Sequence, residues 1–160
     1  MKRHSTVLFL RGVPGSGKST LAKDLEKLGI FTRITADEVG LHAWKQPLID
    51  AIERKEQYII LDRCHSSRRQ RENALNVVEP YKNRVLKVLV TLAKSDYPTL
   101  ERRIRNDVGH AYGVDERLVA LKNHMGEIRR DRVDFKKEGF DQHIFLEINK
   151  AAYLIREIIT

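Results

Sequence analysis

The chain is poor in cysteine, in long apolar runs and in residues that interrupt regular structure. Its one cysteine, Cys64, cannot form an internal disulfide, so the fold must depend on a hydrophobic core, as in proteins of reducing compartments. The longest purely apolar stretches are short pieces such as residues 7–10 and 59–61, and the first of these has no small-residue cleavage site after it. We therefore expect a cytoplasmic protein with no secretion signal and no membrane partner.

The composition is that of an ordinary globular domain. The 160 residues are 41% hydrophobic and 32% charged, with 9 glycines and 4 prolines, a balance that excludes disordered and collagen-like chains. A chain of this length buries roughly two-thirds of its surface on folding, and no linker-like segment divides it, so one domain is expected over residues 1–160. The 30 lysines and arginines against 22 acidic residues leave a net charge of +8, which makes nucleic acid a partner to consider.

Short strand-like runs alternate with longer segments of helical period. This alternation predicts an α/β fold in which crossover helices cover both faces of a parallel sheet. The expected strands span residues 6–10, 31–35, 58–61, 85–91 and 143–148. The expected helices span residues 18–28, 37–55 with an interruption at Pro47, 67–81, 98–107, 115–137 and 150–159.

A phosphate-binding sequence follows directly after the first expected strand. Residues 12–20 read Gly-Val-Pro-Gly-Ser-Gly-Lys-Ser-Thr, which matches G-x-x-x-x-G-K-[S/T] at every fixed position. The glycines let backbone N–H groups turn toward phosphate oxygens, and the helix that follows adds the positive end of its dipole. Lys18 is then placed to reach the β- and γ-phosphates of ATP, and Ser19 to ligate Mg²⁺. The expected ATP-binding residues are Gly12, Pro14, Gly15, Ser16, Gly17, Lys18, Ser19 and Thr20.

Two carboxylates come at the ends of expected strands. Asp62 ends an apolar run and is expected to hold the water shell of Mg²⁺, with a helix cap or an ion pair with Arg63 as the alternative. Asp37 follows the second expected strand, where open α/β sheets bind their ligands, and a carboxylate there can accept the proton of an attacking hydroxyl. Because Thr35 and Glu38 have the spacing of a capping box, the residues alone are equally compatible with a structural role for Asp37.

Arginines follow Asp62 closely. Residues 63–71 hold four arginines and no acid, which suggests a nucleic-acid track at Arg63, Arg68 and Arg71, although arginines on a helix often form only a solvated face. Helical spacing places Arg68 and Arg71 on one side.

A second group of arginines precedes a glycine-bracketed loop. Arg102, Arg103 and Arg105 come before a short segment between Gly109 and Gly113. Such a loop can act as a mobile lid over ATP, and Arg105, the nearest to it, is expected to reach the transferring phosphoryl group. A surface helix followed by an ordinary turn is the alternative.

Three remaining residue types favour structural roles. Trp44 is expected in the core rather than as a platform for a base. Cys64, to which no base can be assigned, is expected to be inert. The six histidines show no metal-ligand spacing.

Together, these residues resemble the kinase domains of phage and bacterial 5′-polynucleotide kinases over nearly the whole chain. The similar features are the phosphate loop, Thr-Ala-Asp at 35–37, the strand that ends at Asp62, Arg-Asn at 105–106, and Phe-Lys-Lys-Glu-Gly-Phe at 135–140 before the last strand. The resemblance implies a P-loop kinase fold with four or five parallel strands and a small helical lid. It also implies ATP and Mg²⁺ as ligands, Asp37 as the general base and Arg105 as a lid arginine.

Two departures from that family concern the acceptor. The family has further lid arginines, where this chain has Gly109, His110 and Tyr112, and Gly40 stands where the family has a substrate-contacting arginine. The preferred hypothesis is an ATP-dependent kinase acting on the 5′-hydroxyl end of DNA or RNA. A hydroxymethylated base in DNA, such as 5-hydroxymethyluracil, and a small molecule such as a nucleoside, sugar acid or antibiotic are alternative acceptors. A non-catalytic nucleotide-dependent switch would need only the loop and Asp62.

Overall fold

The computed structural model describes residues 3–35, 42–92, 96–107, 109, 112–146 and 151–159. Within them, one sheet of five parallel strands has the order β2-β3-β1-β4-β5. The strands are β1 (Ser5–Arg11), β2 (Phe31–Thr35), β3 (Tyr58–Asp62), β4 (Val85–Leu92) and β5 (Gln142–Leu146). The predicted α/β fold is confirmed, and the ends of the predicted strands are shifted by no more than one or two residues.

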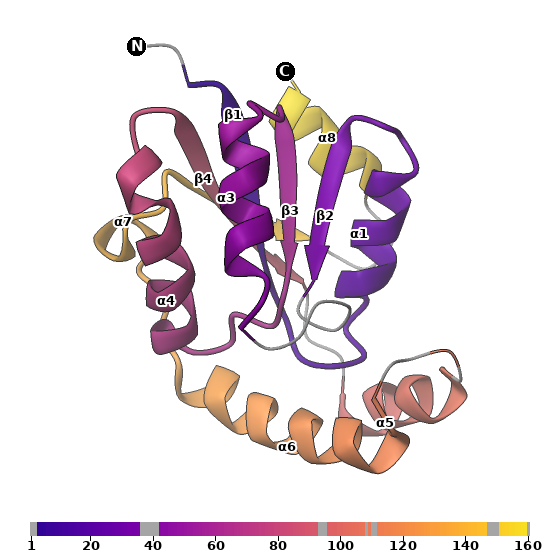
Figure 1. Ribbon diagram of the computed structural model, residues 1–160. Coiled ribbons are helices and arrows are strands. Elements are labelled where there is room, and N and C mark those ends of the chain that lie inside the picture. The colour runs from indigo at the N-terminus through magenta and orange to yellow at the C-terminus, as the bar shows by residue number, and fades with distance from the viewer. Residues whose placement is uncertain are drawn as a thin grey trace.

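Helices cover both faces of the sheet (Figure 1). One face carries α3 (Lys45–Glu53), α4 (Arg68–Val78), the 3-10 turn η1 (Glu79–Tyr81) and α7 (Phe135–Glu138), and the other carries α1 (Lys18–Glu26) and α8 (Ala151–Ile159). Along β1, Val7 and Phe9 pack into the first layer, whereas Leu8 and Leu10 pack into the second. Because both faces are buried, the strands read as nearly continuous apolar runs.

A third helical layer lies at the carboxyl ends of the strands. It consists of α5 (Tyr97–Asn106) and α6 (Val114–Arg130), which lie below the sheet in Figure 1. Leu100 and Ile104 of α5 pack with Leu118 and Leu121 of α6, and Val13 of the phosphate loop joins the same cluster. The loop is therefore packed directly against the two helices that flank the predicted lid segment.

Two predicted helices differ from the observed ones. The predicted helix 115–137 is divided into α6 and α7, because Asp131 leaves the helix to form ion pairs with Arg11 and Arg71. Pro47 does not interrupt its helix: α3 begins at Lys45, and Pro47 lies in its first turn, where the missing N–H has no intrahelical acceptor. Residues 37–41, the first part of the same predicted helix, lie outside the described residues.

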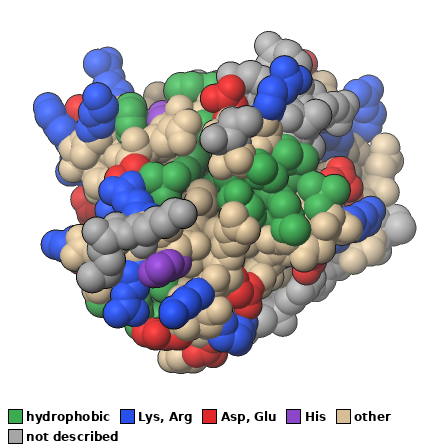
Figure 2. Space-filling model, turned by 90° about the horizontal axis from the view of Figure 1, so that it is seen from above, with side chains coloured by type: hydrophobic (Ala, Val, Ile, Leu, Met, Phe, Trp, Pro, Cys, Tyr) green, Lys and Arg blue, Asp and Glu red, His purple; other side chains and the backbone are tan. Residues whose placement is uncertain are grey.

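The amino edge of the sheet lies opposite this layer. β1 begins there and α8 ends there (Figure 1). Figure 2 looks down on this edge and shows a group of apolar side chains, and the exposed residues Leu28, Ile30 and Ile159 lie where α1 and α8 end. None of the described helices is long and apolar enough to cross a lipid bilayer.

Candidate active site

The phosphate loop connects β1 to α1 in a conformation that requires its glycines. Gly15 and Gly17 have φ values of +80° and +96°, in the left-handed region that disfavours other residues. A Cβ atom on Gly12 would lie 2.6 Å from the Ser16 hydroxyl oxygen. The loop is thus shaped by its own backbone, with the side chains of Ser16 and Lys18 both buried.

Several hydrogen-bond donors lie close together at this loop, and some of them have no acceptor among the described residues. The N-cap of α1 is Gly17, which has no side chain and so offers no acceptor to the first N–H groups of the helix. The buried Ser16 Oγ has no hydrogen-bond partner within the described part of the chain. Lys18 Nζ donates to the carbonyl oxygen of Val13 at 2.9 Å. An anion with several oxygens, such as a triphosphate, fits this set of donors better than any single side chain.

Asp62 ends β3 beside the loop and is almost fully buried. Its Oδ2 accepts hydrogen bonds from Arg33 Nε at 3.1 Å and Arg33 Nη2 at 3.0 Å. Neither predicted structural alternative is observed, because Ser67 caps α4 and the ion pair is with Arg33 rather than Arg63. A serine hydroxyl and a carboxylate are oxygen ligands of the kind Mg²⁺ prefers, so Ser19 and Asp62 suit the ion chemically.

Arg63 follows Asp62 at the carboxyl edge of the sheet. Its guanidinium lies 4.3 Å from the centroid of the Trp44 ring, and Trp44 itself is buried in the core, as predicted. The buried Nη1 of Arg63 has no hydrogen-bond partner among the described residues. Burial lowers the pKa of Arg63. A half-buried, stacked guanidinium whose Nη1 has no acceptor among the described residues is suited to receive an anionic group.

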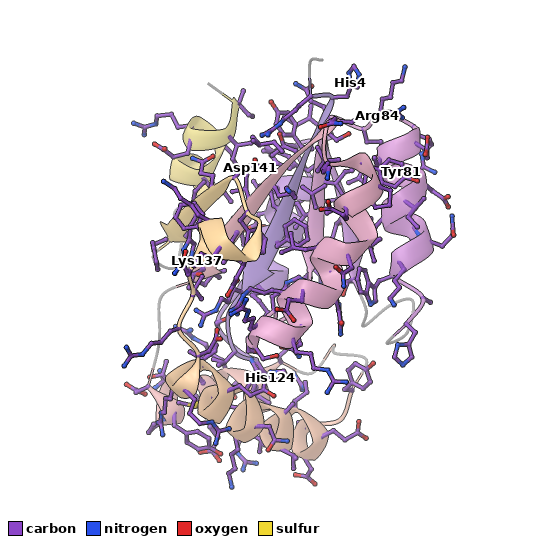
Figure 3. All side chains as sticks on the ribbon, turned by 90° about the vertical axis from the view of Figure 1, so that its left-hand side faces the viewer. His4, Tyr81, Arg84, His124, Lys137 and Asp141 are labelled. Carbon is purple, nitrogen blue, oxygen red and sulfur yellow. The ribbon has the colours of Figure 1, made fainter. Side chains whose placement is uncertain are left out.

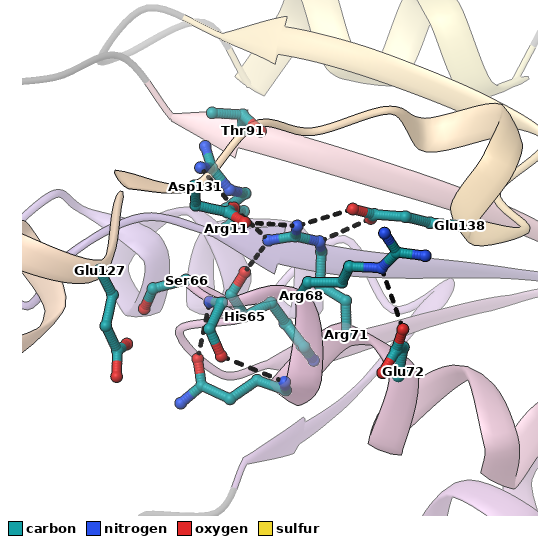
Figure 4. Close-up of polar contacts among 12 residues, drawn as sticks. Arg11, His65, Ser66, Arg68, Arg71, Glu72, Thr91, Glu127, Asp131 and Glu138 are labelled. Carbon is teal, nitrogen blue, oxygen red and sulfur yellow. Dashed lines mark hydrogen bonds and ion pairs between the residues drawn. The ribbon is translucent and has the colours of Figure 1, made fainter. Parts of the chain in front are cut away.

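The structure overturns the prediction of Arg71 as a nucleic-acid contact. Arg71 is fully buried, with Nη1 and Nη2 bonded to Asp131 at 2.7 and 3.1 Å, and Nε and Nη2 bonded to Glu138 at 2.7 and 2.8 Å (Figure 4). Nη1 also donates to the His65 carbonyl at 3.1 Å. No donor is left for a ligand. Arg68 is exposed and pairs with Glu72 one turn away.

The lid arginines are also arranged differently from the prediction. Arg105 is exposed and forms an ion pair with Glu101 at 2.9 Å, so the structure does not bring it to the loop. Arg103 instead donates from Nη1 to the carbonyl oxygen of Gly15 at 3.2 Å. Asp37, the predicted general base, lies outside the described residues, as do Gly40 and His110.

A histidine that sequence reasoning missed joins the site from α6. His124 Nδ1 lies 2.6 Å from Ser66 Oγ and 3.1 Å from Glu127 Oε2, below the amino end of α4 (Figure 3). Burial alone would lower the pKa of His124, but the hydrogen bond and charge of Cys64 and the charge of Glu127 outweigh burial and the nearby Lys18, and raise it. No feature of the sequence indicated that a histidine lies close to the segment of Cys64 and Ser66.

The segment that contacts His124 is itself bonded to the phosphate loop. The Gly12 N–H donates to the Cys64 carbonyl at 3.2 Å. Because His124 and Cys64 are far apart in the sequence, neither spacing nor composition could have indicated this contact.

Known structures share this architecture at low sequence identity. A fungal RNA kinase matches with a TM-score of 0.73 and 16% identity over 99% of this chain and 85% of that one. Kti12 from Chaetomium thermophilum, in complex with ADP-AlF3, matches with a TM-score of 0.63 and 13% identity over 95% and 94% of the two chains.

A sugar kinase from Janibacter sp. matches with a TM-score of 0.60 and 15% identity over 96% and 91%. No family model and no curated protein sequence matches the chain. The chain has the fold of P-loop kinases, with the sheet order described above.

Proposed function

We propose that the protein is an ATP-dependent kinase that transfers the γ-phosphate to a hydroxyl of a nucleic acid, most simply the 5′-hydroxyl end of DNA or RNA. Asp37 accepts the proton of the attacking hydroxyl, while Lys18 and the loop N–H groups stabilise charge on the phosphate oxygens. Ser19 and Asp62 would hold Mg²⁺, which would neutralise further phosphate charge. Positioning by these residues, rather than covalent chemistry, accounts for most of the rate.

One observation carries the nucleotide part of the proposal. At the carboxyl edge of the sheet, the loop gathers the buried Lys18 ammonium, the start of α1, and the Ser16 hydroxyl, which has no hydrogen-bond partner among the described residues. Buried donors without acceptors are rare in folded proteins, because each leaves an uncompensated loss of hydration. A bound triphosphate would satisfy them together.

The acceptor part rests on charge at the same edge. Arg63 presents a buried donor that has no partner in the described part of the chain, on the side where β2 and β3 end. Exposed Arg68 follows on α4, and the chain carries +8 overall. We propose Arg63 and Arg68 as contacts to the acceptor's phosphates. A fungal RNA kinase among the proteins of this fold supports a polynucleotide acceptor by analogy.

The test is transfer of labelled γ-phosphate from ATP with Mg²⁺ to three acceptors in parallel: a 5′-hydroxyl oligonucleotide, a duplex with 5-hydroxymethyluracil, and a nucleoside and sugar mixture. We expect label on the oligonucleotide end, lost in D37N at least a hundredfold, with ATP affinity unchanged. R63Q should raise the KM for the oligonucleotide and leave the KM for ATP unchanged. Label only on the modified duplex would show that the acceptor is the hydroxymethyl group of the base and not the 5′-hydroxyl end.

A small-molecule kinase is the second candidate, because a sugar kinase has the same fold with a similar TM-score. The salt dependence of acceptor binding distinguishes a nucleic-acid acceptor from a small molecule. Binding that neutralises several phosphates weakens steeply with ionic strength, whereas binding of a small acceptor depends on it weakly. Label only on the nucleoside and sugar mixture, with a shallow salt dependence, would replace the preferred function by this one.

A further inference from the structure

Edge strand β5 and helix α7 carry a row of two half-buried rings and one exposed ring that the proposed site does not use. His143 and Phe145 stack with centroids 4.2 Å apart and an interplanar angle of 35°, and Phe135 of α7 extends the row, its centroid 5.8 Å from that of His143. Phe145 is 71% exposed. A phenylalanine this exposed on an edge strand is a liability for solubility unless it serves an interaction.

The middle ring of the row is held in place and uncharged. His143 Nε2 lies 2.8 Å from Thr91 Oγ1 on the neighbouring strand. Burial, together with the positive charges of Arg11 and Arg71, lowers the pKa of His143 to about 4. At neutral pH the row therefore presents π-faces and not a cation.

Exposed cations precede and follow Phe135 closely in the sequence, and Lys136 Nζ lies 5.9 Å from the centroid of its ring. The end of α6, the turn after it and α7 carry five exposed basic residues: Arg129, Arg130, Arg132, Lys136 and Lys137. The acids between them are already committed, since Asp131 pairs with Arg11 and Arg71, and Asp134 caps α7 and lies 3.7 Å from Lys137. In the described part of the chain, Arg129, Arg130, Arg132 and Lys136 form no ion pair. The basic charge is therefore available to an external anion.

The row begins next to the phosphate loop. Phe145 pairs in register with Thr91, and Thr91 with Arg11, the residue before Gly12. Two strand spacings separate Phe145 from Arg11, about 10 Å. The Arg11–Asp131 ion pair at 3.1 Å brings the basic turn to the same edge. Figure 3 shows α7, with Lys137, above the carboxyl end of α6, and Arg84 at the far end of the molecule.

We infer that this aromatic–basic strip, made of Phe135, His143, Phe145, Arg132 and Lys136, binds single-stranded nucleic acid. The inference rests on the proposed function, because the bound segment would be the continuation of the strand whose hydroxyl reacts at the loop. Rings stack on bases regardless of sequence, and flanking cations neutralise the backbone phosphates. An apolar protein partner would not account for the exposed arginines near Phe135 in the sequence, which form no ion pair with any described residue.

The experiment measures equilibrium binding of a fluorescent single-stranded 12-mer with a free 5′-hydroxyl, by anisotropy, in the absence of ATP. F145A should weaken binding about tenfold through loss of one stacked base. R132Q/K136Q should lower the slope of log affinity against log salt by about 1.4, since each lost single-strand phosphate contact is worth about 0.7. Matched controls at the opposite edge of the sheet are L28A for an exposed apolar side chain and R84Q for an exposed arginine, and both should bind as wild type.

Kinetics supply a second readout. F145A should raise the KM for a 5′-hydroxyl 12-mer about tenfold with kcat unchanged, and should leave phosphorylation of a dinucleotide and the affinity for ADP as in wild type. Equal binding of the 12-mer by F145A and wild type would overturn the inference, as would no binding by wild type. Loss of ADP affinity in F145A would also overturn it, by assigning the ring to the base of the nucleotide. Binding through Phe145 without any phosphorylation would refute the proposed function and leave the strip standing.

Discussion

His65 lies between the phosphate loop and α4, with its backbone in the left-handed region at φ +44°. Its Nδ1 donates to the Leu10 carbonyl at 2.7 Å, and its buried Nε2 has no partner in the described residues. Burial, aided by the positive charges of Arg63 and Arg71, lowers the pKa of His65 from 6.5 to about 3. The folded state therefore holds this ring neutral at pH values where the unfolded chain binds a proton.

This shift predicts that the stability of the protein begins to fall at a pH well above the range in which carboxylates bind protons. Between pH 6.5 and 3 the unfolded chain binds the extra proton, so the free energy of unfolding must fall as pH falls, by about 3 kcal/mol down to pH 4. H65N, in which asparagine tolerates the positive φ, should flatten this decline. Urea titrations at half-unit pH intervals measure the effect. His143 contributes a smaller decline in both proteins, and equal slopes for H65N and wild type would contradict the assignment.

The raised pKa of His124 predicts the opposite pH dependence of the free energy of unfolding. Its pKa is raised in the folded state, so its contribution is fully present below the unfolded value of 6.5 and is lost as pH rises through the folded value. H124Q should therefore be less stable than wild type by about 1 kcal/mol at pH 6, with the difference shrinking toward pH 9. Urea unfolding of both proteins at these pH values measures the difference. A difference that stays constant with pH would mean that His124 acts only by packing.

The conformation of a segment was predictable from the sequence where a motif fixes the backbone, whereas the direction in which a helical side chain points was not. The phosphate loop has the predicted form, because its glycines determine its conformation. Arg71 was misassigned, although it lies on the stripe formed by Ala74, Leu75 and Val78, which is the buried side of α4. Arg105 was predicted to reach the phosphates because it is nearest in sequence to the glycine-bracketed segment. Arg103 instead lies on the side of α5 that faces the phosphate loop, as its bond to Gly15 shows.

At the scale of elements, one buried ionic cluster joins four parts of the chain. Arg11 of β1, Arg71 of α4, Asp131 after α6 and Glu138 of α7 meet beside the loop (Figure 4). Burial raises the pKa of Asp131, but the hydrogen bonds and charges of Arg71 and Arg11 outweigh it and hold that pKa below its usual range. The cluster fixes the end of α6 against the sheet.

Removal of Arg71 should therefore destabilise the whole domain. R71Q leaves Glu138 buried without its cation, a situation that costs about 3–5 kcal/mol. R68Q on the same helix is the matched control, since its exposed pair with Glu72 is worth at most about 0.5 kcal/mol. Urea unfolding at pH 7 measures both. A loss below about 1 kcal/mol in R71Q would show that the cluster is not a principal source of stability.

The division between α6 and α7 explains why element boundaries were harder to predict than element types. Residues 131–134 contain neither glycine nor proline, and their sequence continues a helical pattern. The helix ends because the ion pairs of Asp131 with Arg11 and Arg71 stabilise the fold more than a further helical turn would. This is a tertiary effect, which local helix propensity cannot indicate. The strands were predicted closely because burial on both faces gives each one a distinct apolar run.

At the scale of the whole molecule, the parallel sheet and its helical layers were predictable, whereas the grouping of distant segments at one edge was not. Strand order places the ends of β1, β3 and β2 side by side, which brings the loop, Asp62 and Arg63 together. The contact of α6 with the segment after β3, through His124, depends on a packing of helices that no sequence signal specifies.

The proposed nucleotide site at this edge predicts that the stability of the domain rises when nucleotide is added. Lys18 donates to the loop's own Val13 carbonyl, and the Ser16 hydroxyl has no partner among the described residues. Mg²⁺-ADP at a hundred times its dissociation constant should add about 2.7 kcal/mol to the free energy of unfolding. For a domain of this size, that corresponds to a rise in Tm of roughly 5–10 °C.

K18A should lose most of this rise, whereas D37N, which changes only the proposed base, should keep it. K23A removes an exposed lysine from the same helix and should behave as wild type. Differential scanning fluorimetry over a range of nucleotide concentrations makes the comparison. An unchanged Tm in wild type would refute nucleotide binding at the loop, and an equal rise in K18A would place the nucleotide elsewhere on the protein.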